Sequence, residues 1–248
     1  MWSKPWPASF WQNSRRKARR SVSFKRVESL TMPREPMQSR FPHLWLAAQK
    51  MIGGTRDKSK LVMRHYSNQK RIVEIGCSLG NLSDAYRDLA GISYTGVDID
   101  AAAISIAQRR FAARKNFRFE AVPVAELARR GERYDYAVIA GILHHVDDET
   151  AIGIIGSSWE ITAPGGVLIA SEPEALRPAD NAIFRLFYRL EEGQFLRSRQ
   201  EMAALFDAAG VPVTSLEDHL VSPGIVTWPP VARFNLVRAD RAAATPAQ

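Results

Sequence analysis

The chain has 248 residues, 46% of them hydrophobic, and a single cysteine, Cys77. These figures fit one α/β domain with a sizeable core and short tails, and they exclude an internal disulfide. No apolar run approaches the ~18–20 residues that would span a bilayer. We therefore expect a cytoplasmic protein, because a lone cysteine fits a reducing compartment.

The net charge of +8 is concentrated near the N-terminus. Residues 1–31 hold eight of the 34 basic residues and one of the 26 acidic residues, so the remainder, with 26 and 25, is nearly neutral. An enzyme acting on nucleic acid more often spreads positive charge over its folded face. We expect residues 1–40 to be a disordered basic extension outside the fold.

Three origins of this extension stay open. It is upstream sequence from a misplaced start, with Met32 or Met37 as the true beginning; or a basic arm that contacts anionic lipid or nucleic acid; or an arginine- and serine-rich targeting segment. A secretory signal is disfavoured, because no apolar core of 7–15 residues follows the arginines.

From residue 44 onward the predicted elements alternate between helices and strands. A short helix at 44–52 and a second at 58–68 precede a buried strand at 71–75. A helix carrying Leu82, Tyr86 and Leu89 on one face leads to a strand at 92–97. Asp100 is a natural N-cap for the next helix. Further strands are expected at 117–122, 136–140 and 167–171, with a helix at 149–162.

The last third of the chain is more variable. Residues 172–197 form a cap-like insertion with an amphipathic helix around residues 183–190. Ser198 and Glu201 have the spacing of a capping box for a helix at 199–209. Two strands at 213–220 and 231–238 complete the domain. We expect an α/β domain at 41–240, built on a mostly parallel sheet, and a disordered tail at 241–248.

The most informative stretch follows the first predicted strand. It has glycines at positions 76 and 80, and Asp98 closes the next strand about 20 residues later. Glycine permits close approach of backbone to a ligand, and a carboxylate at the second strand end accepts hydrogen bonds from both ribose hydroxyls. This pattern predicts a nucleoside-binding crevice.

The glycine spacing is not that of a dinucleotide site. The motif G-x-G-x-x-G would need glycine where the chain has Ser78 and Asn81. We also place Glu74 at the mouth of the loop, where its charge would repel a phosphate. A cationic or amine-bearing nucleoside without phosphate, such as S-adenosylmethionine, suits these residues better.

Further motifs follow in order along the chain. After E-x-G-x-x-x-G at 74–80 and Asp98 come Asp135 at the fourth strand, Leu143-His144-His145, and Pro-Gly-Gly at 164–166. Over residues 60–240 this series resembles the class I S-adenosylmethionine-dependent methyltransferases. The resemblance implies a Rossmann-like seven-stranded sheet, mostly parallel, with an antiparallel edge strand and helices on both faces. It also implies S-adenosyl-L-methionine as cofactor.

The same resemblance assigns the cofactor residues. Glu74 would contact the methionine part, often through water, and Asp98 the ribose, whereas Ile99 would lie against the adenine. For Glu74 the alternative is a buried acid that caps the following loop, and for Asp98 it is a carboxylate that caps a helix. Pro123 stands where the family often has an aspartate, so adenine would be held by the backbone near Val124. The expected cofactor-binding residues are Glu74, Gly76, Ser78, Gly80, Asp98, Ile99 and Val124.

Two further pairs are candidates for chemistry. His144 and His145 follow the fourth strand, where a histidine can act as general base; the alternative is that one of them only orders the loop. Arg185 and Arg189 lie one turn apart on the helix of the cap and would bind a carboxylate or phosphate of the substrate; the alternative is a solvated face. The sequence predicts no metal site.

We expect methyl transfer to a small-molecule acceptor by in-line displacement. The Asn/Asp-Pro-Pro-aromatic motif of enzymes that methylate amino groups of nucleic-acid bases is absent after the fourth strand. Two alternatives stay open: an RNA methyltransferase that uses the basic N-terminal arm, and a cofactor-binding module without catalysis. The sequence does not specify the acceptor atom or the oligomeric state.

Overall fold

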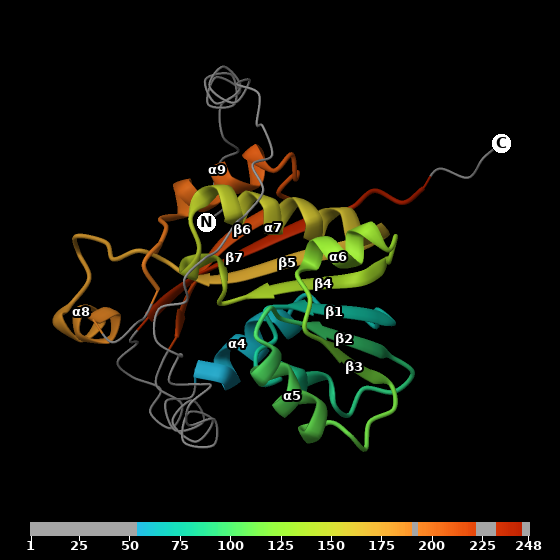
Figure 1. Cartoon of the computed structure of the whole chain (residues 1–248). Helices are drawn as coiled ribbons and strands as arrows, with labels where there is room; N and C mark the ends of the chain where they lie inside the picture. Colours follow the sequence, from blue (N-terminus) through green and yellow to red (C-terminus); the bar gives the residue numbers. More distant parts are fainter. Residues whose placement is uncertain (1–53, 190–192, 222–231, 245–248) are drawn as a thin grey trace, which may run out of the picture. The chain divides into compact units, whose positions relative to one another are not determined.

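A seven-stranded sheet forms the centre of the computed structural model, which describes residues 54–189, 193–221 and 232–244 (Figure 1). The strand order is β3-β2-β1-β4-β5-β7-β6. The strands are β1 (Arg71–Ile75), β2 (Ser93–Val97), β3 (Phe117–Glu120), β4 (Tyr134–Ala140), β5 (Thr162–Pro173), β6 (Ser215–Val221) and β7 (Ala232–Asp240).

Helices connect these strands. They are α4 (Gly54–Met63), α5 (Ala101–Arg110), α6 (Val124–Arg129), α7 (Asp148–Ile161), α8 (Ala182–Arg189) and α9 (Arg199–Ala208). Two short 3₁₀ helices, η1 (Leu82–Tyr86) and η2 (Leu143–His145), follow β1 and β4. Among the described helices, none is both long and apolar enough to cross a membrane.

Strands β1 to β5 pair in parallel with one another, and β7 pairs antiparallel with both β5 and β6. The Rossmann-like prediction is therefore confirmed, including the antiparallel pairing near one edge. Because the carboxyl ends of β1, β2, β4 and β5 meet at one edge of the sheet, the loops after these strands lie beside one another.

Helices cover both faces of the sheet, because each face buries an apolar core. One core contains Val73, Ile139 and Leu168 from the strands, with residues of α6, α7 and α9 packed over them. The opposite core, under α4, η1 and α5, contains Ile72 and Val138 from the same strands. Successive side chains of a strand point to opposite faces, which explains why β1 and β4 are apolar almost throughout.

Most predicted elements are present within a few residues of their expected ends. Asp100 caps α5 and Ser198 with Glu201 forms the capping box of α9, both as predicted. The helix expected at 58–68 is α4, which begins four residues earlier and ends at Met63. The helix expected at 44–52 lies outside the described residues.

Three elements of the structure differ from the predicted ones. The helix through Leu82, Tyr86 and Leu89 is only the single turn η1, because Ser83 and Tyr86 both turn into the core. Helix α6 was not predicted, since six residues are too few to show a period. Strand β5 begins at Thr162 and so includes the Pro-Gly-Gly segment, whereas the strand was expected to begin only at residue 167.

Candidate functional site

The loop after β1 is shaped by close backbone packing. Gly76 has a φ of +73°, and a Cβ there would lie closer than 3.0 Å to the side chain of Ile142, which follows β4. The amides of Gly76 and Cys77 donate to the carbonyl of Val97 at the end of β2, at 2.8 and 3.1 Å. The loop is thereby fixed to the ends of β2 and β4, the two strands that flank β1.

Ser78 and Asp98 hold each other in place across the crevice. Ser78 has a φ of +47°, and its amide donates to Oδ2 of Asp98 at 2.8 Å. The amide of Asp100 donates to Oδ1 of Asp98 at 2.9 Å, and burial raises the pKa of Asp98 in spite of these bonds. Asp100, and not Asp98, is the helix cap, because it accepts from the amides of Ala102 and Ala103.

Glu74 lies beneath the loop and not at its mouth, which corrects the prediction. Its side chain accepts hydrogen bonds from Tyr94 and, at 3.4 Å, from Ser83. Burial raises the pKa of Glu74 to about 8, so its carboxyl is mainly protonated at neutral pH. The argument that its charge would repel a phosphate therefore does not hold in this structure.

The remaining predicted cofactor residues differ in exposure. Gly80 ends the loop at a φ of +75°. Ile99 is 81% exposed just after β2, whereas Val124 is buried at the first turn of α6. Pro123 is the N-cap residue of that helix.

A buried pair lies at the ends of β4 and β5. Nδ1 of His144 is 2.7 Å from Oε2 of Glu172, and both side chains are 3% exposed or less. Oε1 of Glu172 accepts from the amide of Ile142 at 2.9 Å. Burial would raise the pKa of Glu172, but the hydrogen bonds from His144 and the Ile142 and Leu143 amides outweigh it and lower that pKa. The carboxylate is therefore ionised and orients the imidazole.

The surroundings of this pair come from the segment that follows α8. The amide of Phe195 donates to the carbonyl of His144 at 3.0 Å, and the backbone of Gly193 lies against the edge of the His144 ring. His145 is exposed, with its ring 4.0 Å from that of His144. A carboxylate and the segment after α8 together hold the buried imidazole of His144 in place.

Residues 73–168 match a family model described as a methyltransferase domain, and they include β1, β2 and β4 with the loops that form the crevice. This part of the chain is therefore similar to a methyltransferase domain, and the sheet around it has the Rossmann-like arrangement that the sequence predicts. No curated protein sequence matches it closely enough to count as a relative.

Several solved structures share the fold of this methyltransferase domain. An O-methyltransferase family protein from Burkholderia thailandensis aligns with a TM-score of 0.62 at 16% identity, over 84% of this chain and 64% of its own. A SAM-dependent methyltransferase from Methanosarcina mazei aligns with a TM-score of 0.57 at 17% identity, over 74% of this chain and 98% of its own. Phosphoethanolamine N-methyltransferase 2 from Haemonchus contortus aligns with a TM-score of 0.62 at 12% identity, over 83% of this chain and 60% of its own. At these identities the likeness shows the fold.

The crevice fits the cofactor of this family. Oγ of Ser78 is buried and has no hydrogen-bond partner in the described part of the chain. The carboxylate of Asp98 lies next to Ser78, and the apolar side chain of Ile99, the residue after Asp98, is exposed to solvent. An orphaned hydroxyl, a carboxylate and an apolar surface within one loop cluster are groups that could bind an adenosine with a polar tail.

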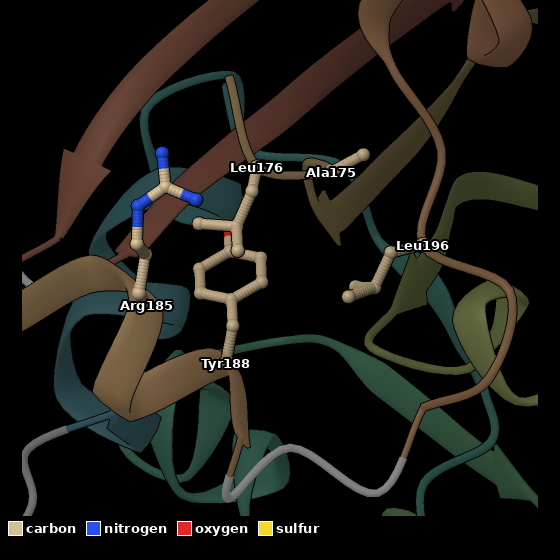
Figure 2. Close-up of a pocket in the computed structure, with 5 residues that line it drawn as sticks. All are labelled: Ala175, Leu176, Arg185, Tyr188 and Leu196. Carbon is tan, nitrogen blue, oxygen red and sulfur yellow. The ribbon is translucent and has the colours of Figure 1, made fainter. Parts of the chain in front are cut away.

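The cap forms a pocket beside this site. Its cavity has a volume of about 310 Å³ and is lined by Ala175, Leu176, Arg185, Tyr188 and Leu196. Figure 2 shows Arg185 and Tyr188 rising from α8 toward Leu176, with Leu196 opposite. Arg185 thus lies on the pocket wall, whereas the side chain of Arg189 lies outside the described part of α8.

Sequence reasoning missed two residues of the site. Glu172 is one of them; its only signal was an acid at the carboxyl end of a predicted strand. The other is Arg197, whose guanidinium is buried and donates to the carbonyls of Leu143 and Val146 at 2.6 and 2.8 Å. The same guanidinium forms an ion pair with Asp148 at 2.8 Å, so Arg197 connects η2 to the first residue of α7.

Proposed function

We propose that this methyltransferase transfers the methyl group of S-adenosylmethionine to a hydroxyl group of a small organic acceptor, with His144 as general base. The observation that carries this proposal is the buried contact of 2.7 Å between His144 and Glu172 at the edge where the crevice opens. A base is needed only for a nucleophile that starts protonated, and a hydroxyl is such a nucleophile.

We further propose that the crevice residues bind the cofactor. Asp98 would accept the ribose hydroxyls, Ile99 would cover the adenine, and Ser78 would bind the polar tail. Glu74 would ionise and contact the methionine part, and the backbone at Val124 would hold the adenine edge. Gly76 and Gly80 would give the loop the close approach that this requires.

The bound cofactor supplies a methyl group on a sulfonium, which is a good leaving group. With the cofactor bound, the acceptor oxygen would take the methyl group in line with the carbon–sulfur bond, and the electron pair of that bond would remain on sulfur as a neutral thioether. The hydroxyl proton passes to Nε2 of His144. Ionised Glu172 keeps the proton of His144 on Nδ1 and stabilises the imidazolium that forms.

Access to His144 requires a change in its cover. Gly193 packs against Cδ2 of the ring, which is next to Nε2. An acceptor hydroxyl reaches Nε2 only after this segment shifts, and its return would exclude water during the reaction. Arg185, on the pocket wall, would bind an acidic group at the far end of a larger acceptor.

The test uses methyl-labelled S-adenosylmethionine with a metabolite extract. Wild-type protein is expected to form a labelled small product, and His144→Gln to form it 10²–10⁴-fold more slowly with unchanged affinity for S-adenosylhomocysteine. Glu172→Gln is also expected to form the labelled product more slowly than wild type. A protein that binds the cofactor product but labels nothing would contradict the proposal, as would full activity of His144→Gln.

The domain limits and the location belong to the same proposal. We propose residues 41–240 as the catalytic unit, 172–197 as its cap and 1–40 as an extension. Two of the neighbours with this fold are named as O-methyltransferases, one of them for mitomycin, which agrees with a small acceptor. A cytoplasmic location agrees with the single, buried Cys77.

A further inference from the structure

Lys58 extends from α4 across the ends of the central strands. Its Nζ lies less than 3.0 Å from the position that a Cβ would take on Gly141, the residue that follows β4. It also lies 5.4 Å from the ring centroid of Phe234 in β7. A single ammonium group therefore lies over the edge of the sheet where the proposed acceptor would bind.

Within the described residues, no group accepts a hydrogen bond from this ammonium group. Its one contact of note among the described residues is the face of Phe234, and no oxygen there is within hydrogen-bonding distance of it. The acid at the same edge, Glu172, already uses one oxygen for His144 and the other for the amide of Ile142. An ammonium group carries three donors, so a partly buried one without an acceptor is suited to an anion brought by a ligand.

Lys58 and His144 approach the same point. Cε1 of His144 also lies within 4 Å of the Cβ position on Gly141. A small molecule that pairs with Lys58 while it offers a hydroxyl to His144 therefore carries its anionic group and its hydroxyl close together, separated by one or two carbon atoms. This arrangement describes a 2-hydroxy acid, aliphatic or aromatic.

A carboxylate at Lys58 has two possible sources, the acceptor and the methionine part of the cofactor. The crevice loop follows β1 and Asp98 follows β2, on one side of β4. Lys58 spans from β4 toward Phe234 on β7, on the other side of β4. Its position thus belongs to the acceptor half of the site.

We propose that Lys58 binds the carboxylate of the methyl acceptor, and that the acceptor is a 2-hydroxy acid methylated on its hydroxyl oxygen. This inference rests on the proposed function and adds to it the substrate class and a residue that determines specificity. The ion pair, in a site partly closed to water, favours the acid over any neutral isostere.

The experiment compares acids with their amides. Protein saturated with S-adenosylhomocysteine is titrated by calorimetry with 2-hydroxybenzoate and 2-hydroxyoctanoate, each against its amide. Wild type is expected to bind at least one acid tenfold or more tightly than its amide. Lys58→Met is expected to lose that preference, with unchanged affinity for the amide and for S-adenosylhomocysteine. Lys60→Met, on the same helix but exposed, is the matched control and should behave as wild type.

Three outcomes overturn the inference. The first is that wild type binds neither acid more tightly than its amide. The second is that Lys58→Met still binds an acid more tightly than its amide. The third is that Lys58→Met lowers the affinity for S-adenosylhomocysteine instead, which would assign Lys58 to the cofactor carboxylate. Failure of the proposed function is distinguishable from all three. In that case wild type and Lys58→Met differ in acid binding as expected, but no labelled product forms from either acid or from the extract.

Discussion

Tyr94 donates a hydrogen bond to Glu74 beneath the crevice loop, and neither side chain is more than 3% exposed. Ser83 bonds both of them, at 2.7 Å from the Tyr94 hydroxyl. This group of three lies under the site proposed for the cofactor. Burial raises the pKa of Glu74 to about 8, although the hydrogen bonds from Tyr94 and Ser83 act in the opposite direction, so the carboxyl is mainly protonated near neutral pH.

The first prediction concerns proton release on cofactor binding. The sulfonium and amino groups of S-adenosylmethionine favour ionised Glu74, so binding at pH 7 should release a proton. Calorimetry in two buffers of different ionisation enthalpy measures the release. We expect a fraction of a proton for wild type and almost none for Glu74→Gln, and an equal release in both would contradict the assignment.

The second prediction concerns stability and pH. The pKa of Glu74 is about 8 in the folded chain and lower when unfolded, so the folded state holds the proton more tightly. The free energy of unfolding should therefore fall as pH rises from about 4.5 to 8, by linkage. Urea unfolding at pH 5.5 and 7.5 should show Glu74→Gln gaining stability relative to wild type at the higher pH. A constant difference between the two proteins would contradict this prediction.

The third prediction separates two aspartates that lie two residues apart. Asp98→Ala should abolish detectable binding of S-adenosylhomocysteine in calorimetry, because the ribose acceptor and the anchor of the Ser78 amide are both lost. Asp100→Ala removes only the N-cap of α5, which costs ~0.5–2 kcal/mol of stability, and should leave the affinity unchanged. Wild-type affinity in Asp98→Ala would refute the ribose assignment.

The fourth prediction uses a glycine. A Cβ on Gly193 would lie closer than 3.0 Å to the ring of His144, so Gly193→Ala must displace the ring or its cover. Methyl transfer should fall at least tenfold, with the affinity for S-adenosylhomocysteine unchanged.

Gly156→Ala provides the matched control. Gly156 lies in α7, and a Cβ there meets nothing within 4 Å. This variant should keep full activity and gain ~0.5–1 kcal/mol of stability, because alanine is the better residue in a helix. Full activity in Gly193→Ala would show that the cover of His144 is not needed.

The fifth prediction concerns Arg197. Arg197→Met leaves the carbonyls of Leu143 and Val146 without their donor, so the free energy of unfolding should fall by roughly 2 kcal/mol or more. Chemical denaturation measures this loss. Arg199→Met, whose side chain is 39% exposed, should cost less.

The fold was predictable because its signals are local. The apolar run of β4, the cap at Asp100 and the capping box at Ser198 each depend on a few adjacent residues. The expected helix after residue 82 failed for the opposite reason. Its outcome depends on Ser83 bonding Tyr94, which is eleven residues away, and on the burial of Tyr86.

The site was predictable only in part, for the same physical reason. The loop at Gly76 and the acid at Asp98 follow strand ends, which a pattern shows. Glu74 was misplaced because no pattern reveals that Tyr94 lies beneath it. Glu172 contacts His144 only because β4 and β5 pair in parallel, and such a contact has no signature within either segment.

The insertion of β7 between β5 and β6 has a consequence for synthesis. Residues 232–240 emerge late from the ribosome, and until then the outer edge of β5, next to Glu172, has no partner. A nascent chain therefore exposes an apolar strand edge from the completion of β5 at Pro173 until β7 is made, and such edges invite aggregation. Shortening the C-terminus by one strand would unpair β5 and β6 together, so the gene should tolerate premature stops far less than the modest size of the lost segment suggests.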